Sequence, residues 1–198
     1  VPAFAQDDSA REIEEVVITA LRKETNLQDT AITITAITGA DLEVKQIENF
    51  EDLQFAVPTL GFAKGAYSGS GITLRGIGNF AVGNSTSASI GYFWNGQTAS
   101  ASGLYEQEFF DVERVEVLRG PQGSLFGAGT TGGLIQMITK RPDAEAGGYL
   151  KADVADYDSL RMEGAVNLPL TDKLRSRVAF ASLQREGFVM NNHTGNKL

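Results

Sequence analysis

The pattern of apolar and polar residues predicts a mixed α+β fold in the first two thirds of the chain. An alternating run at 32–37 indicates a strand, and Thr38, with a carboxylate three residues later, favours the start of a helix. A second cap at Asn49 and helical spacing that ends before Pro58 predict two short helices within 40–56. The sequence therefore predicts a strand followed by a pair of short helices.

Further strand candidates follow, separated by loops rich in glycine, serine and asparagine. The strands are predicted at 72–75, 89–94, 112–118 and 134–139. The loops are predicted at 61–71, 78–88 and 95–104. Loops of this length on a rigid sheet often carry function, so the predicted domain is a small mixed β-sheet with short helices and long, functional loops.

The pattern changes from Tyr149 onward, where apolar and polar residues alternate over longer segments. Two such segments are followed by a short turn at 170–173 and a third strand at 175–185. Alternation over about 10 residues is typical of strands that cross a bilayer in a β-barrel. A soluble amphipathic sheet has the same period, so periodicity alone leaves both interpretations open.

Composition excludes several classes of function. The chain has 17 basic and 25 acidic residues and a net charge of −8, which disfavours binding to nucleic-acid phosphates. It has no cysteine and a single histidine, His193, which excludes disulfides, zinc-finger spacings and cysteine nucleophiles. No apolar run approaches the ~20 residues that a membrane-spanning helix requires.

One glycine motif could be mistaken for a nucleotide site. Residues 127–132 read G-x-G-x-x-G, but a β-branched alternating run follows at 134–139, where a dinucleotide site would need a helix. Gly133 also stands where a phosphate-binding loop would need lysine. With no catalytic constellation elsewhere, we expect neither enzymatic activity nor a cofactor.

The beginning of the chain has features of an exported protein. Ala3 and Ala5 form the A-x-A arrangement that signal peptidase accepts, and a polar stretch follows. We interpret residues 1–5 as the remnant of an export signal, with an ordinary frayed terminus as the alternative. A short β-prone run at 16–20 then stands as an extended segment in a polar tail.

A family resemblance covers nearly the whole chain. The string 109–127 is similar to the plug signature of TonB-dependent receptors, and 132–142 continues it in the same register. Residues 74–78 resemble the family's arginine–glycine motif, and 53–60 its helix that ends in Val-Pro. Residues 14–20 look like the TonB box. Modest departures from the family pattern occur at Leu134, Gln136 and Asn95-Gly96.

The resemblance implies a domain order and a function. It implies a tail at 6–24, a plug domain at 25–142 and about three strands of a transmembrane β-barrel at 147–198. Because closure of a barrel needs at least about 8 strands, we expect the chain to be truncated. The implied function is TonB-dependent uptake of a scarce ligand, by family frequency a ferric siderophore, through the outer membrane of a Gram-negative bacterium, with the plug gating the barrel.

Other substrates and one other class stay open. Haem, cobalamin and oligosaccharide are alternative substrates, and a plug-only periplasmic binding protein is the alternative class. The resemblance implies a monomer whose partners are the periplasmic domain of TonB, outer-membrane lipid and the ligand.

The resemblance also implies three sets of site residues. The TonB-coupling residues are Glu14, Glu15, Val16, Val17, Ile18, Thr19 and Ala20. The residues expected to lock the plug to the barrel are Arg75 and Arg119, with Glu116 beside them; the alternative is that both arginines form ion pairs within the plug, with Glu113 or Glu116. The ligand-binding residues expected at the loop apices are Phe62, Lys64, Tyr67, Phe80, Asn84 and Tyr105.

Overall fold

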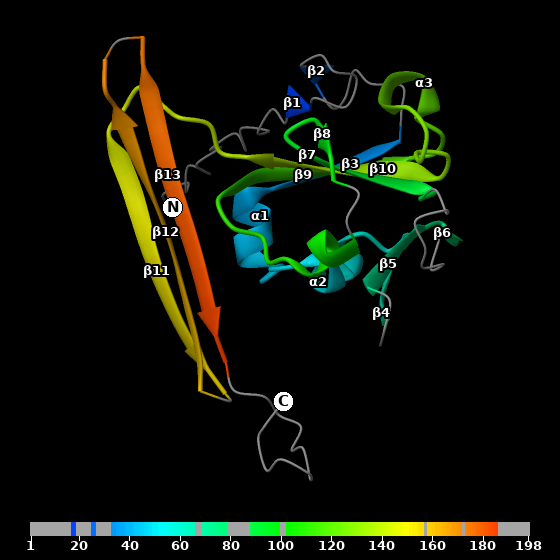
Figure 1. The fold of residues 1–198 in the computed structure, drawn as a ribbon, viewed down its shortest axis with the longest axis horizontal. Coiled ribbons are helices and arrows are strands. Elements are labelled where there is room, and N and C mark those ends of the chain that lie inside the picture. The colour runs from blue at the N-terminus through cyan, green and yellow to red at the C-terminus, as the bar shows by residue number, and fades with distance from the viewer. Residues whose placement is uncertain are drawn as a thin grey trace, which may run out of the picture.

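The structure is a computed structural model in which a mixed domain lies beside a separate three-stranded sheet (Figure 1). It describes residues 17–18, 25–26, 33–65, 69–78, 88–99, 102–156, 158–171 and 173–185. We use the name mixed domain for residues 33–139, which contain a five-stranded sheet, a three-stranded sheet and the helices. The separate sheet is formed by the last strands of the described chain.

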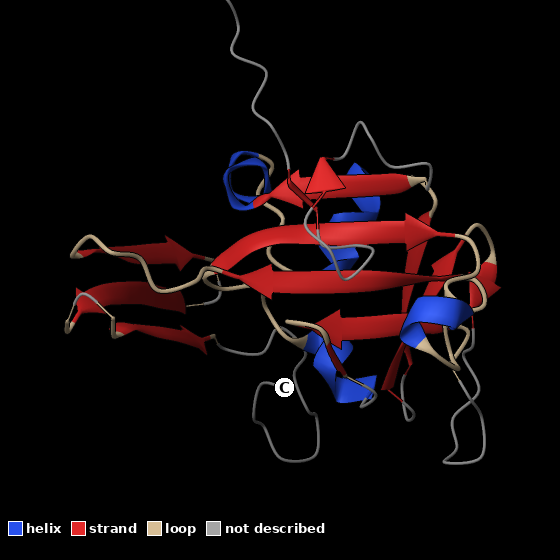
Figure 2. Cartoon of the chain, turned by 90° about the horizontal axis from the view of Figure 1, so that it is seen from above, coloured by secondary structure: helices blue, strands red, loops and turns tan. Residues whose placement is uncertain are grey.

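The five-stranded sheet is the centre of the mixed domain, and Figure 2 shows its strands side by side. Its spatial order is β3 (Ile34–Thr38), β9 (Val112–Arg119), β10 (Gly133–Thr139), β7 (Ile90–Trp94) and β8 (Gln97–Thr98). Strand β10 pairs antiparallel with β9 and parallel with β7, which makes the sheet mixed. The strands predicted near 34, 90, 112 and 134 are confirmed.

The two predicted helices are also confirmed. Helix α1 (Gly39–Val44) begins at a capping box in which Thr38 and Asp41 bind each other's backbone N–H groups. Helix α2 (Phe50–Ala56) begins at Asn49, whose side chain accepts a hydrogen bond from the Asp52 N–H. A 3-10 helix, η2 (Ser102–Glu106), and a one-turn helix, α3 (Gly123–Phe126), complete the set. No helix in the described ranges is long and apolar enough to cross a membrane.

The predicted loop at 61–71 is wrong, because most of it forms a β-hairpin. Strand β4 (Leu60–Gly65) pairs antiparallel with β5 (Gly69–Leu74), and β6 (Ile77–Gly78) extends the sheet. Low strand propensity of glycine suggested a loop, but Phe62 pairs with Ile72 and Leu60 with Leu74 across the hairpin. These apolar cross-strand pairs outweigh the propensity. The predicted loop at 95–104 likewise contains β8 and the start of η2.

Apolar side chains fill both faces of the five-stranded sheet. The larger cluster joins Val115, Val117 and Ile135 of the sheet to Phe50 and Leu53 of α2. The smaller cluster lies on the other face and contains Phe93, Leu118, Phe126 and Leu134, so that α3 covers it. In Figure 1 the helices α1 and α2 accordingly lie on one side of the sheet and α3 on the other.

The separate sheet contains β11 (Gly147–Ala155), β12 (Ser159–Pro169) and β13 (Arg175–Gln184), all antiparallel. It buries charged residues and exposes apolar ones, which is the reverse of an ordinary soluble sheet. In β12, Arg161 and Glu163 are buried, whereas their neighbours Leu160 and Met162 are exposed. The other exposed large apolar residues of the sheet are Leu150, Val154, Val166, Leu168, Val178, Phe180 and Leu183.

Replacing Gly133 with alanine is expected to destabilise the five-stranded sheet. Gly133 has a φ of +141°, and an added Cβ would lie 2.4 Å from the Leu118 carbonyl oxygen. We expect local stability to fall by about 1–3 kcal/mol, measured by native-state hydrogen exchange of β9 and β10 amides. Gly147→Ala is the matched control, since no atom lies within 4 Å of its added Cβ. Equal effects of both substitutions would contradict the prediction.

Candidate functional site

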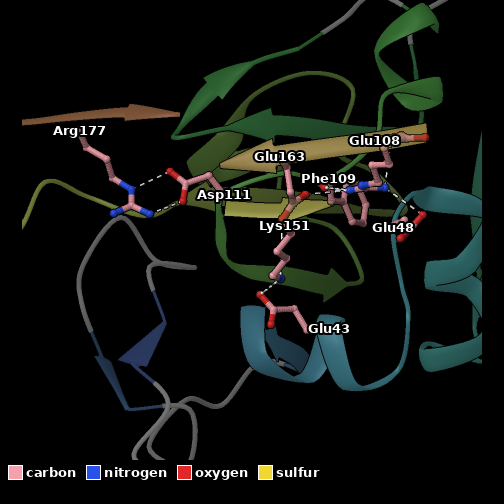
Figure 3. A network of polar contacts seen from close by, with 9 residues as sticks. Glu43, Glu48, Glu108, Phe109, Asp111, Lys151, Glu163 and Arg177 are labelled. Carbon is pink, nitrogen blue, oxygen red and sulfur yellow. Dashed lines mark hydrogen bonds and ion pairs between the residues drawn. The ribbon is translucent and has the colours of Figure 1, made fainter. Parts of the chain in front are cut away.

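An ion-pair network joins the separate sheet to the mixed domain (Figure 3). Its centre is Arg161 of β12, whose side chain is only 9% exposed. Atom Nη1 of Arg161 lies 2.9 Å from Glu48 and 2.9 Å from Glu108. Atom Nη2 lies 3.1 Å from Glu163 and donates a hydrogen bond of 3.1 Å to the Phe109 carbonyl. One arginine thus binds two separate segments of the mixed domain.

A second arginine of the sheet binds the mixed domain with two hydrogen bonds. Arg177 of β13 donates from Nε and Nη2 to the two carboxylate oxygens of Asp111, at 2.7 and 2.5 Å. Both side chains are largely buried, with 13% and 6% exposure, so solvent screens this pair weakly. Lys151 of β11 adds a contact of 2.7 Å to Glu43, but both groups are exposed and the pair contributes little.

Carboxylates from both the mixed domain and the separate sheet crowd around this network. The pKa of Glu48 is raised, because its burial and the nearby carboxylates of Glu108, Asp52 and Asp153 outweigh the attraction of Arg161. Arg161 is thus shared among the carboxylates of Glu48, Glu108 and Glu163. Loss of this arginine would leave these carboxylates uncompensated at the interface.

The two segments that Arg161 binds are also connected to each other. The Phe109 N–H donates to the Glu48 carbonyl at 2.6 Å. The Phe109 ring packs edge-on against Phe50, with centroids 5.1 Å apart. This places the ion pairs next to the main apolar cluster, so that movement of residues 108–109 would disturb both.

Two pockets lie on either side of the segment 105–112. The β4–β13 pocket, of about 480 Å³, lies between β4, η2 and the end of β13. Its lining includes Lys64, Tyr105, Glu106, Glu108 and Arg185. The β11–α1 pocket, of about 200 Å³, has Asp111, Tyr149 and Arg161 in its wall. Glu108 therefore touches the first pocket while its ion-pair partner touches the second.

Three of the predicted ligand residues come together in the β4–β13 pocket. Phe62, Lys64 and Tyr105 all line it, although the first two are in a strand and not in the predicted loop. Tyr105 also belongs to the core, with its ring 5.9 Å from Phe50 and 5.6 Å from Tyr92, and burial raises its pKa. The others, Tyr67, Phe80 and Asn84, lie outside the described residues.

The predicted lock residues Arg75 and Arg119 meet at Thr59. The Arg119 guanidinium donates to the hydroxyls of Thr59 and Thr35, at 3.0 and 2.6 Å. Arg75 is exposed in the turn after β5, and its backbone N–H donates to the Thr59 carbonyl at 2.8 Å. Their pairing with barrel carboxylates stays a prediction.

The carboxylates named as alternative partners bind a different arginine. Glu116 is fully buried and accepts a hydrogen bond of 2.8 Å from Nε of Arg114. Glu113 is also an ion-pair partner of Arg114. Sequence reasoning did not single out Arg114, because a charged residue in an alternating strand is usually assigned to the solvent face.

The predicted TonB-coupling segment is not isolated. Val17 and Ile18 form β1, which pairs antiparallel with β2 (Thr25–Asn26). The remaining predicted coupling residues, Glu14, Glu15, Val16, Thr19 and Ala20, lie outside the described residues. In Figure 1, β1 and β2 lie above the five-stranded sheet and β4 and β5 lie below it.

Sequence reasoning also missed the residues of the interface network. Arg161 and Arg177 occupy the polar positions of alternating strands, and this alternation was a usable signal for a buried polar face. No signal in the sequence pointed to Glu48, Glu108 or Asp111 as partners of these arginines, because these carboxylates meet the separate sheet only through tertiary structure.

Comparison with known proteins gives one family match and many relatives. The family described as TonB-dependent Receptor Plug Domain matches residues 26–134. The pesticin receptor of Yersinia pestis is 26% identical over 205 residues, which cover 98% of this chain and 29% of the receptor. The ferric enterobactin receptor of Pseudomonas aeruginosa is 32% identical over 193 residues, covering 87% and 25% of the two chains.

Solved structures of receptors have the same fold. The ferric yersiniabactin uptake receptor FyuA from Yersinia pestis is similar with a TM-score of 0.74 and 27% identity. The match covers 84% of this chain and 26% of FyuA. The chain thus spans less than a third of the length of these relatives.

Proposed function

Because the chain belongs to the TonB-dependent receptor plug domain family, a family of transport receptors, we propose that it forms the plug and first sheet of a ferric-siderophore receptor. Transport, and not catalysis, is the proposed role. Relatives named as ferripyoverdine and ferric enterobactin receptors support a ferric siderophore as the substrate. The proposed location is the outer membrane of a Gram-negative bacterium, with a monomer as the working unit.

The polarity of the separate sheet is the observation that carries this proposal. Arg161 and Arg177 of that sheet turn towards the mixed domain, whereas Val166 and Phe180 are exposed on the outer side. A soluble amphipathic sheet would pack its apolar side against the domain and expose its charges. The observed arrangement suits a sheet whose outer side meets lipid hydrocarbon and whose inner side holds a plug.

The positions of β1 and of the β4–β13 pocket suggest which side of the receptor faces the periplasm and which faces the outside of the cell. We propose that the segment 14–20 lies on the periplasmic side, where TonB binds it by strand addition. Strand β4, which lines the β4–β13 pocket, lies on the other side of the five-stranded sheet from β1 (Figure 1), so this pocket would face the outside of the cell and receive the ligand through Phe62, Lys64 and Tyr105. Arg75 and Arg119, with Glu116, remain the proposed lock to further barrel carboxylates.

Uptake by a receptor-deficient strain tests the proposal. The complete natural polypeptide that carries this chain would be produced in such a strain, and uptake of iron would be measured with ferric enterobactin and ferripyoverdine as probes. We expect uptake of at least one ferric siderophore that stops when the inner-membrane energy supply is dissipated. Uptake of haem, cobalamin or an oligosaccharide instead would contradict the substrate, and a plug-only periplasmic binding protein would give binding without uptake.

A further inference from the structure

We propose that Glu108 couples the β4–β13 pocket to the contact that holds the plug against the sheet. Glu108 lines that pocket, and its carboxylate is one of the two plug carboxylates that Arg161 binds. The inference rests on the proposed function, since it assigns the pocket to ligand. It names Glu108 and Arg161 as positioning residues through which the pocket and the plug–sheet contact influence each other.

The burial of the two partners sets which of them can move. The Arg161 side chain is 9% exposed, and its other contacts to Glu48, Glu163 and the Phe109 carbonyl hold it in place. Glu108 is 30% exposed and borders the pocket. A new interaction in the pocket would therefore draw Glu108 away from Arg161 more easily than it would displace the arginine.

Backbone contacts carry such a movement into the plug. Glu108 precedes Phe109, whose N–H binds the Glu48 carbonyl and whose own carbonyl accepts from Arg161. Glu48 is in turn the second carboxylate on the same Nη1 atom. Residues 48 and 108 are thus linked through the Phe109 backbone and through one shared arginine, so that displacement of one segment displaces the other.

The chemistry of Glu108 defines what kind of ligand group would act on it. A carboxylate accepts hydrogen bonds, so a ligand amine or hydroxyl in the pocket would compete with Arg161 for it. Lys64 and Arg185 line the same pocket and suit the anionic part of a chelate. Coupling is reciprocal, so release of Arg161 must also change the pocket wall.

Hydrogen exchange in the complete natural polypeptide tests this coupling without any ligand. The reporters are the Gln107 amide on the pocket side, bonded to Leu104, and the Ile47 amide on the far side, bonded to Leu42. Arg161→Gln is expected to speed exchange at Gln107, and Glu108→Gln to speed it at Ile47, each by roughly two- to fivefold. The double variant is expected to match the Arg161→Gln variant, because that substitution already removes the contact between Arg161 and Glu108.

Two matched variants separate this coupling from general loosening. Glu106 lines the same pocket but is bound by Ser70 at 2.7 Å, so Glu106→Gln should leave Ile47 unchanged. Arg177→Gln breaks another plug–sheet pair and should leave Gln107 unchanged. If Arg161→Gln impairs folding, Arg161→Lys supplies a milder change. Additive effects in the double variant, or a Glu108→Gln effect confined to Gln107, would overturn the proposal, and a lack of siderophore uptake would bear only on the proposed function.

Discussion

Replacing Val17 with proline is expected to abolish energised uptake of the ferric siderophore while its binding to cells persists. Val17 lies in β1 and pairs with Asn26 of β2, so this residue already adopts the extended conformation that strand addition requires. Proline removes the backbone N–H that a pairing strand would bind. We expect uptake to fall by roughly an order of magnitude or more, because transport cannot proceed without coupling.

The controls distinguish the coupling segment from its hairpin. Val17→Ile keeps a strand-forming residue and the N–H, and should transport normally. Thr25→Pro breaks the β1–β2 pairing from the other strand and should also retain uptake, since the proposed TonB-binding residues are unchanged. Undiminished energised uptake by the Val17→Pro variant would show that residues 14–20 are not the coupling segment.

Replacing Phe50 with alanine is expected to give the largest loss of plug stability. The Phe50 side chain is 0% exposed and makes edge-on ring contacts with Tyr92, Tyr105 and Phe109. Truncation leaves a cavity at the centre of the main cluster, which costs about 3–5 kcal/mol. Native-state hydrogen exchange of the β9 and β10 amides in the complete polypeptide measures this loss.

The same helix provides a matched control for this substitution. Phe55 lies in α2 as well but is 81% exposed, so Phe55→Ala should change stability by less than about 0.5 kcal/mol. If the two variants were equally stable, the role of α2 as the cover of the sheet would be wrong. Because Tyr105 also lines the β4–β13 pocket, Phe50→Ala should weaken ligand binding too.

Much of the mixed domain could be predicted because local signals agree with tertiary structure there. The cap at Thr38 and the stop at Pro58 bound the two helices, and alternation in 112–118 and 134–139 marks the central strands. The β4–β5 hairpin could not be predicted in the same way. Its glycines suggested a loop, but apolar cross-strand pairs such as Phe62 with Ile72 and Leu60 with Leu74 made it a hairpin.

The sequence predicted which region contributes to the candidate site better than it predicted the individual residues. Phe62, Lys64 and Tyr105 were expected to meet a ligand, and they line one pocket. The partners of the sheet arginines were not expected, because Glu48 and Asp111 look like ordinary surface carboxylates in the sequence. Which distant segment a charged side chain faces depends on the tertiary structure. Neither the period of the apolar residues nor a short motif predicts it.

The position of β10 in the sheet has a consequence for the order in which the plug is made. Strand β10 is the last of the five in the chain, yet it lies between β9 and β7. Until residues 112–139 emerge from the ribosome or the export channel, β3 and β7 have no partner on the side that these strands will occupy. The nascent chain therefore carries bare apolar strand edges until residues 133–139 are available, so we expect it to depend on a holding chaperone until β10 inserts and closes the sheet.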